Sequence, residues 1–247
     1  MFIKKWEELP ESLRNDAVRP YYDILVRKQG ALVLKRLFDI VVSACMLIVL
    51  APVFLLLAVA IKLDSPGPVF YRQVRVTQYG KQFRIFKFRT MVSNADKIGT
   101  QVTVGNDARI TRVGKFIRKC RLDEVSQLID IFRGTMTFVG TRPEVPKYVD
   151  SYTPEMMATL LLPAGVTSLA SIMYKDEDAL LTGAADVDKA YIEEVLPGKM
   201  RYNLRAIELF SFWGEIKIMF MTVFAVLGKD YSKEAQALLR EKESTKL

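Results

Sequence analysis

The pattern of hydrophobic and polar positions is dominated by one long apolar run, residues 40–61, which contains no charged side chain. As a straight α-helix this run would extend about 33 Å, enough to cross a hydrocarbon core of about 30 Å. A single transmembrane helix is therefore one interpretation. Pro52 lies near the middle of the run, however, and a proline inside a helix removes a backbone hydrogen bond and kinks or breaks the helix. Each half would then reach only about half-way through the bilayer.

The flanks of the apolar run favour two half-length helices over a single transmembrane helix. Because positive residues remain on the cytoplasmic side of a membrane, a spanning segment should have asymmetric flanks. Here both flanks are basic, with Arg27, Lys28, Lys35 and Arg36 on one side and Lys62, Arg72 and Arg75 on the other. Symmetric flanks indicate a re-entrant helix–break–helix segment that enters and leaves by the same membrane face.

The rest of the chain predicts mainly helices and one small β-hairpin. Residues 69–77 and 82–89 are rich in β-branched and aromatic side chains and are separated by a four-residue turn, which is typical of a hairpin. Apolar residues at helical spacing predict a helix over 107–121 and a second helix that starts near Leu122 and stops at Gly134. The fold class expected is mainly α (α+β).

Two more helices are expected near the C-terminus, over 186–196 and 200–227, with Pro197-Gly198 between them. The second has a broad apolar surface in which Glu215 and Lys217 are the charges. This surface predicts either an amphipathic helix at the membrane interface or a buried core helix. Residues 1–30 are polar with aromatic positions and predict short helices outside the bilayer.

The composition excludes several chemistries. The 247 residues include no His and only two Cys, Cys45 and Cys120. Without His there can be no Ser-His or Cys-His nucleophile pair and no His-ligated zinc. Two isolated cysteines can form neither a zinc knuckle nor a disulfide framework, which favours a reducing cytosolic environment. Acid–base or covalent chemistry must therefore use carboxylates, Lys, Tyr or Ser.

The basic charge is concentrated in one block. Residues 62–121 contain 14 basic and 3 acidic residues, a net charge of +11 in a chain whose total is +8. Such a block predicts an anionic partner, which could be the phosphates of a nucleotide, a nucleic acid or acidic lipid head groups.

An acidic pair, Asp123-Glu124, follows this basic block directly. One interpretation is that the pair caps the second helix, with Glu124 and Gln127 at capping-box spacing. The other is that an aspartate kept ionised by the helix terminus and nearby arginines attacks a phosphorus atom. Both can hold together.

Phosphate binding would need basic side chains to converge on this pair. Lys87, in Lys87-Phe88-Arg89, ends the hairpin, and Arg142 follows Phe138-Val139-Gly140. Each alone is typical of a solvated cation. Together with Arg118 near the carboxylates they would form a phosphate clamp.

The same residues carry a family resemblance. The chain resembles the bacterial sugar transferases, the monotopic phosphoglycosyl transferases that initiate membrane glycan assembly, from about residue 34 to about residue 227. The motifs are Lys35-Arg36-x-x-Asp39, the Pro52-interrupted apolar helix, Gly67-Pro68-x-Phe70-x-x-Gln73, Lys87-Phe88-Arg89-Thr90-Met91, Leu122-Asp123-Glu124-x-x-Gln127-Leu128 and Gly134-x-Met136-x-x-Val139-Gly140-x-Arg142-Pro143.

The resemblance implies an activity. The enzyme would transfer a sugar 1-phosphate from a UDP-sugar to polyprenyl phosphate and release UMP. Asp123 would be the nucleophile that forms a phosphosugar ester. Glu124 would assist through a Mg²⁺ ion, held by Asp123 and Glu124, or as a proton acceptor.

The resemblance also assigns binding and anchoring roles. It places Lys87, Arg118, Arg142 and Pro143 at the substrates. It makes Lys35, Arg36, Asp39 and Pro52 the residues that anchor the re-entrant helix.

The resemblance further implies an organisation and a location. Residues 1–33 would be an N-terminal helical extension, 34–63 the re-entrant membrane helix, and 64–247 a cytosolic and interfacial catalytic domain. The protein would be monotopic on the cytoplasmic face of the bacterial inner membrane, in contact with membrane lipids and without a nucleic-acid partner. The sequence is compatible with a homodimer but does not indicate one.

The sequence departs from the family pattern at three places. Ala51 replaces the serine that usually precedes the proline, Thr141 replaces the first proline of Pro-Arg-Pro, and residues 163–168 differ from the usual Pro-Gly-(Ile/Val)-Thr-Gly. We expect this last segment to shape the sugar or nucleotide pocket, and the sugar therefore stays open.

Two other classes of function stay open. The run Phe83-Arg84-Ile85-Phe86-Lys87-Phe88-Arg89 interleaves basic and aromatic residues, as in a membrane-tethered binding module for nucleic acid or anionic lipid. The second class is a sugar transferase with an Asp-x-Asp site, which releases UDP. Asp176-Glu177-Asp178 and Asp186-Val187-Asp188 match that loose pattern.

Overall fold

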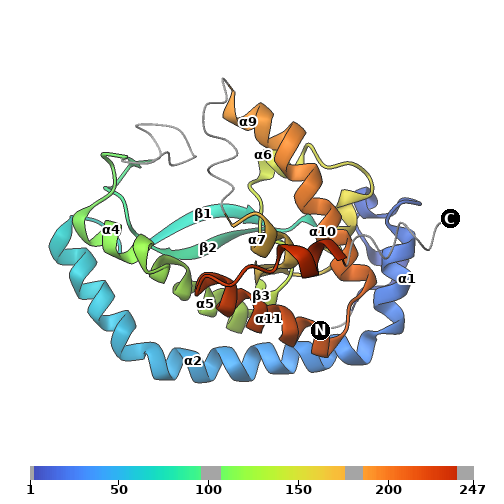
Figure 1. Cartoon of the computed structure of the whole chain (residues 1–247), viewed down its shortest axis with the longest axis horizontal. Coiled ribbons are helices and arrows are strands. Elements are labelled where there is room, and N and C mark those ends of the chain that lie inside the picture. The colour runs from blue at the N-terminus through green and yellow to red at the C-terminus, as the bar shows by residue number, and fades with distance from the viewer. Residues whose placement is uncertain (1–2, 96–106, 176–185, 238–247) are drawn as a thin grey trace.

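A computed structural model describes residues 3–95, 107–175 and 186–237. Helices predominate in these residues, with two small sheets (Figure 1). The elements in chain order are η1 (Trp6–Glu8), η2 (Glu11–Leu13), α1 (Arg19–Arg27), α2 (Gln29–Asp64), β1 (Phe70–Val76), η3 (Gln78–Gly80), β2 (Gln82–Phe88), α4 (Arg112–Lys119), η4 (Leu122–Gln127), α5 (Leu128–Arg133), β3 (Met136–Val139), α6 (Pro146–Val149), η5 (Met156–Leu161), β4 (Ala164–Thr167), α7 (Leu169–Met173), α9 (Val187–Ala190), η6 (Tyr191–Val195), α10 (Leu196–Glu208) and α11 (Phe212–Val226). The expected mainly helical fold with a small hairpin is confirmed.

Helix α2 is the one element of the described residues that is long and apolar enough to cross a membrane. Its most apolar stretch has a mean hydropathy of 3.0 and is only 11% buried. One stripe nevertheless packs against the protein, because inward-facing residues recur every three or four positions. They are Leu32, Lys35, Asp39, Ser43, Leu47, Leu50, Phe54, Leu57 and Ile61. The other side of α2 is exposed, as at Ile48 (75%) and Leu63 (84%).

A kink or a break is expected at Pro52, and of these two the break is wrong. Helix α2 continues through Pro52, and its ribbon bends as it turns toward α4 (Figure 1). A proline inside a helix removes one hydrogen bond, but packing on both sides can hold the remaining turns together. The stripe supplies that packing, since Leu50 and Phe54 contact the core on either side of Pro52. The re-entrant path through a bilayer stays a prediction.

The predicted hairpin is confirmed. Strands β1 and β2 pair antiparallel from Phe70↔Phe88 to Val76↔Gln82. The turn between them contains Tyr79 at φ 60° and Gly80 at φ 74°, two left-handed residues that reverse the chain. Because side chains alternate across a strand, Lys87 and Arg72 lie on opposite faces of the hairpin.

The two helices predicted after residue 107 are present with different boundaries. Helix α4 begins after Thr111, whose hydroxyl accepts a hydrogen bond from Gly114 N, so Thr111 is the N-cap. The second helix begins as the 3₁₀-helix η4 and becomes α-helical only at Leu128. It stops as expected at Gly134, which is left-handed at φ 87°.

A second sheet was not predicted. Strands β3 and β4 pair in parallel, and Gly140 and Gly165 meet where the pair ends. A Cβ on Gly165 would lie 2.1 Å from Gly140 N, so only glycine allows this approach. The strands are four residues each, too short for alternation to reveal them in the sequence.

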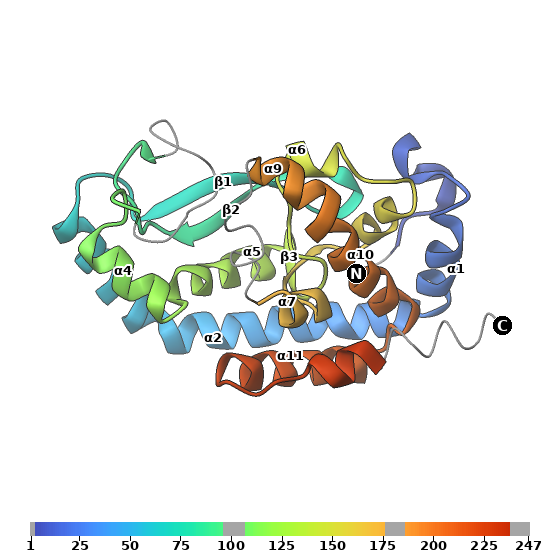
Figure 2. The ribbon, with the colours of Figure 1, turned by 45° about the horizontal axis from the view of Figure 1, so that its top comes forward.

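The boundary between the C-terminal helices was placed wrongly. Helix α10 runs through Pro197-Gly198, because Pro197 occupies its first turn, where no backbone N–H is needed. The chain breaks instead before α11, whose N-cap Ser211 accepts from Gly214 N. One face of α11 packs on α7 through Met221, and the other is exposed, as at Trp213 (77%). Helices α11 and α2 lie side by side (Figure 2).

The largest hydrophobic cluster of the described residues joins the N-terminal segment to segments far along the chain. Residues 3–25 contribute side chains such as Leu13, Val18 and Leu25, which are at most 1% exposed. They pack against the hairpin turn, η5 and the end of α10. The N-terminal segment is therefore part of the core that supports β1.

Candidate active site

The acidic pair lies at the first turn of η4. Arg121, just before it, has the left-handed conformation at φ 54°, which is uncommon for a residue with a side chain. This reversal turns the chain from α4 into η4. Ser126 Oγ donates to Phe86 O at 3.1 Å and fixes η4 against β2. The pair is thereby held beside the end of β2 that carries Lys87.

Glu124 brings two predicted cations together. Lys87 Nζ lies 3.1 Å from Glu124 Oε1, and Arg142 binds both carboxylate oxygens. No side chain caps η4, so the capping-box interpretation is wrong. Burial alone would raise the pKa of Glu124, but Arg142 and Lys87 outweigh it and hold this pKa well below its ordinary value.

Asp123 has a different environment. Among the described residues its carboxylate forms no ion pair within 4 Å. Burial raises the pKa of Asp123, and the neighbouring Glu124 adds to the rise, while Lys87 and Arg118 oppose it. Adjacent carboxylates whose pKa values are shifted in opposite directions are typical of a site with two chemical roles. Asp123 is the more basic of the two and keeps its oxygens available.

Two more arginines complete a ring of positive charge. Arg118, a predicted substrate residue, donates from Nε to Thr90 Oγ1 at 2.9 Å and is close enough to influence Asp123. Arg75 was not singled out from the sequence as a site residue. Its guanidinium donates to Gln73 Oε1 at 2.7 Å and to Pro143 O at 3.0 Å. The spacing of Gln73 and Arg75 on one strand face could have indicated that Arg75 is a site residue.

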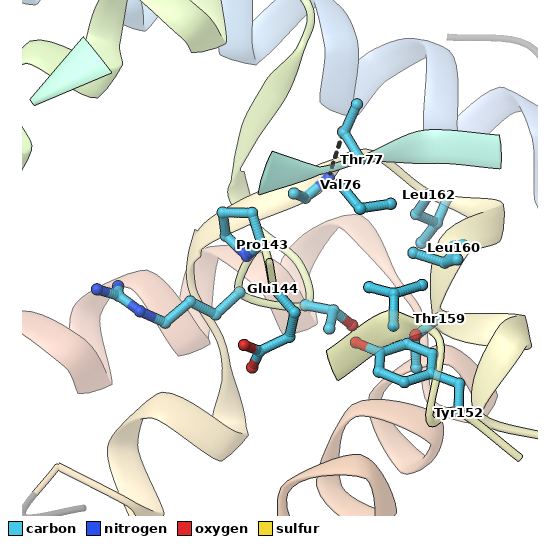
Figure 3. A pocket seen from close by; sticks show the side chains of 12 residues that line it. Val76, Thr77, Pro143, Glu144, Tyr152, Thr159, Leu160 and Leu162 are labelled. Carbon is cyan, nitrogen blue, oxygen red and sulfur yellow. Dashed lines mark hydrogen bonds between the residues drawn. The ribbon is translucent and has the colours of Figure 1, made fainter. Parts of the chain in front are cut away.

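Pro143 contributes to the site through its backbone carbonyl and not through a contact with the acidic pair. It follows Arg142 and accepts the bond from Arg75. Behind it lies a cavity of about 10 Å³, room for one water molecule (Figure 3). The side chains of Glu144 and Tyr152 both line it. This space is too small for a sugar or a nucleotide.

Glu144 belongs to a buried network that the sequence did not reveal. Tyr191 Oη donates to Glu144 Oε1 at 2.5 Å, and Lys199 Nζ donates to Tyr191 Oη at 2.8 Å. Val76 N donates to Glu144 O at 2.9 Å. The segment that carries Arg142 is thus tied to β1 and to α10.

The predicted anchoring residues of α2 bind protein groups. Lys35, 3% exposed, donates to Val139 O and pairs with Glu215 of α11. Arg36 donates to Ile131 O and Phe132 O at the end of α5. Asp39 accepts from Thr137 Oγ1 and Phe138 N on β3. These bonds hold α2 against α5, β3 and α11. The contact of these residues with lipid stays a prediction.

The Asp-x-Asp alternative finds no support at residues 186–188. Asp186 caps α9 by accepting from Lys189 N, and Asp188 binds Lys147 and Tyr148 Oη. Asp176 and Asp178 lie outside the described residues. Within the described residues no group of three or more His, Cys, Asp or Glu could hold a metal ion.

The comparisons with known proteins decide the family. The model of the family "Bacterial sugar transferase" matches residues 30–229. This chain belongs to the bacterial sugar transferase family. The match covers α2, the hairpin, the acidic pair and α11, and it leaves residues 3–29 outside. The family predicted from the motifs is therefore confirmed.

Curated relatives agree with this assignment. A UDP-glucose:undecaprenyl-phosphate glucose-1-phosphate transferase of Escherichia coli is 36% identical over 219 residues, which are 87% of this chain and 44% of that protein. A UDP-N-acetylgalactosamine-undecaprenyl-phosphate N-acetylgalactosaminephosphotransferase of Aeromonas hydrophila is 35% identical over 78% of this chain and 44% of its own length. A glucose-1-phosphate transferase of Caulobacter vibrioides is 35% identical, and 70% of it is covered. The chain thus spans less than half the length of the first two.

Proposed function

We propose that this bacterial sugar transferase transfers a sugar 1-phosphate from a UDP-sugar to polyprenyl phosphate. The observation that carries the proposal is the contrast between Asp123 and Glu124 inside the ring formed by Lys87, Arg75, Arg118 and Arg142. With Glu144 beside Arg75 counted, four cations face three carboxylates, and this positive balance suits a diphosphate. The relatives' names describe this type of reaction with undecaprenyl phosphate.

The reaction would have two steps. A carboxylate oxygen of Asp123 attacks the β-phosphorus of the donor, and the bond from that phosphorus to the bridging oxygen breaks, releasing UMP. A phosphate oxygen of the acceptor then attacks the same phosphorus and displaces Asp123. The product is a polyprenyl diphosphate sugar, and the carboxylate is regenerated. One phosphoanhydride replaces another, so positioning and charge stabilisation supply the catalysis.

Glu124 would act by holding cations. A carboxylate whose pKa is lowered by two cations is a weak base, which disfavours the proton-acceptor role. In this proposal Glu124 fixes Lys87 and Arg142 where the donor phosphates bind. These cations would then move from the carboxylate toward the diphosphate.

The resemblance also implies Mg²⁺, and the residues present fit that ion. Magnesium is usually bound by one or two carboxylates together with substrate phosphates, so a cluster of three acidic residues is not needed. Asp123 keeps carboxylate oxygens that no cation of the described residues occupies. Asp123 would hold the ion, joined by Glu124 once Lys87 and Arg142 have moved to the diphosphate, and the ion would neutralise charge on the donor diphosphate.

The exposed apolar sides of α2 and α11 support a location at a membrane. Leu63 of α2 and Leu227 after α11 are 84% and 76% exposed, respectively. We propose that α2 enters the cytoplasmic face of the bacterial inner membrane and returns to it, with α11 at the head-group level. Reporters fused to both termini should then be accessible only from the cytoplasm, and access to either terminus from outside would contradict this path.

A donor panel tests the activity directly. Purified full-length protein would be incubated with undecaprenyl phosphate and UDP-glucose, UDP-galactose, UDP-GlcNAc or UDP-GalNAc, and UMP and UDP would both be measured. Release of UMP with one donor is expected, and release of UDP would favour the Asp-x-Asp mechanism. Without acceptor, intact-mass analysis should show a phosphosugar adduct on the wild type and none on Asp123→Asn. A reaction that requires both substrates together and forms no adduct would exclude the covalent route.

A further inference from the structure

Two arginines lie over one aromatic ring on the hairpin face opposite Lys87, and a third, Arg84, is close enough to Arg72 to repel it. The guanidinium of Arg72 lies 3.4 Å from the centroid of the Phe86 ring, and that of Arg133 lies 5.5 Å from it. Arg72 also donates to the backbone carbonyl of Arg84 on the paired strand. We call Arg72, Arg84 and Arg133 the arginine cluster. Both Arg84 and Phe86 belong to the alternating basic and aromatic run of the sequence, which the proposed reaction uses only at Lys87.

Protein carboxylates balance the charge of the arginine cluster only in part, since Asp130 attracts Arg72 and Arg133 without an ion pair to either. Within the described part of the chain none of its three members forms an ion pair. The nearest acidic group, Asp130, is 2% exposed and accepts hydrogen bonds from Phe86 N and Thr135 Oγ1. Three like charges held close together repel one another, and an anion bound between them would relieve that repulsion.

The arginine cluster lies close to the proposed membrane side. Arg133 is the last residue of α5, and its neighbour Phe132 is 48% exposed. Arg36 of α2 donates to the carbonyl of Phe132, so the end of α5 touches α2. In both views α5 lies between the hairpin and α2 (Figures 1 and 2). A cationic group beside an apolar helix is typical of surfaces that contact acidic head groups.

We propose that the arginine cluster binds the phosphodiester head group of an acidic membrane phospholipid. The inference rests on the membrane location proposed above and goes beyond the transfer reaction. The cluster is not part of the donor site, because the alternation of β1 and β2 places Arg72, Arg84 and Phe86 on the other face from Lys87, and Arg133 lies by Phe86. Phe86 would support the guanidinium planes while their N–H groups point to the phosphate oxygens.

Vesicle binding tests this inference. The triple variant Arg72→Gln/Arg84→Gln/Arg133→Gln would be compared with the wild type on phosphatidylcholine vesicles with and without phosphatidylglycerol. The acidic lipid should strengthen wild-type binding, and the triple variant should lose about tenfold to a hundredfold of that gain. The matched control Arg14→Gln/Lys189→Gln/Arg201→Gln removes the same charge from exposed positions elsewhere and should keep the gain. Equal gains in both variants would overturn the proposal.

Further arms separate folding and other ligands. Arg72→Lys/Arg84→Lys/Arg133→Lys keeps the charge and should keep most of the acidic-lipid gain, whereas its complete loss would overturn the electrostatic account. If the glutamine variant instead loses salt-sensitive RNA binding with unchanged vesicle binding, the partner is a nucleic acid. In neutral detergent the KM for polyprenyl phosphate should match that of the control variant. A rise in that KM would assign the cluster to the acceptor and refute the phospholipid proposal. UMP release, measured in the same samples, reports separately on the transfer reaction.

Discussion

Neutralising Glu124 and neutralising Asp123 should have opposite effects on the stability of the fold. Glu124→Gln keeps the shape of the side chain but removes the charge that holds Lys87 and Arg142, and the side chain of Lys87 is only 21% exposed. Removing one partner of a largely buried ion pair leaves the other charge uncompensated, at a cost of about 3 kcal/mol. For a chain of this size that loss lowers the melting temperature by roughly 6–12 °C.

Asp123→Asn should cost no stability. Asp123 forms no ion pair in the described residues, and burial disfavours its charge, so an uncharged amide removes a penalty. The melting temperature should therefore stay at or above that of the wild type at neutral pH. UMP release should nevertheless fall by at least about a thousandfold, because the proposed nucleophile is gone. A variant that is stable and inactive is the expected signature of a functional residue.

Differential scanning fluorimetry in detergent, together with UMP release, measures both effects. Asp16→Asn and Glu193→Gln are matched controls, because both carboxylates are exposed and lie away from the site. An Asp123→Asn protein that melts as early as Glu124→Gln would refute the inferred difference between the two carboxylates. A Glu124→Gln protein that melts with its control would show that the contacts with Lys87 and Arg142 add nothing.

The pH dependence of stability should also differ between the two carboxylates. The folded pKa of Glu124 is lowered, so its stabilising contribution is present above the unfolded pKa of about 4.3 and is lost as the pH falls toward the folded pKa. The folded pKa of Asp123 is raised. Its unfavourable contribution is therefore present at neutral pH and disappears as the pH falls through that raised pKa.

Three further predictions concern the surroundings of the pair. The acid limb of the kcat/KM profile should follow protonation of Asp123, so kcat/KM decreases as the pH falls through its raised pKa; a kcat/KM that is flat across the acid range would contradict a carboxylate nucleophile. Arg75→Gln removes the bond to Pro143 O and a charge that we propose lies beside the donor phosphates. It should lower kcat/KM for the UDP-sugar at least about tenfold, measured by UMP release; an unchanged value would place Arg75 outside the site. Lys35→Met leaves Glu215 buried without its partner and should destabilise the fold by about 3–5 kcal/mol, whereas Lys35→Met/Glu215→Gln should recover most of the loss in a thermal melt; no recovery would indicate that the pair is not the cause.

Much of the site could be predicted because it depends on residue types in a fixed order. Lys87, Arg118 and Arg142 converge on the acidic pair as expected, although they come from a strand, a helix and a loop. The sequence could not show that Glu124 binds the cations while Asp123 stays unpaired, since this depends on the 3₁₀ turn after Arg121. Arg75 and Glu144 were missed because their roles arise from contacts between segments far apart in the chain.

The fold was predictable where a pattern is long and periodic. The hairpin and the stop at Gly134 follow from alternation and from a left-handed glycine. The parallel pair of β3 and β4 was not foreseen, because four residues carry too little periodicity and the pairing partner lies far along the chain. The passage of α10 through Pro197 was missed because a proline is equally compatible with a stop and with a first helical turn.

The N-terminal segment limits how this protein can be shortened. Residues 3–25 supply seven of the 17 buried side chains in the largest hydrophobic cluster, yet the family match begins only at residue 30. A truncation made at that boundary would expose a hydrophobic groove along η5 and the hairpin turn. The shortened enzyme would aggregate or lose stability before its activity could be assayed.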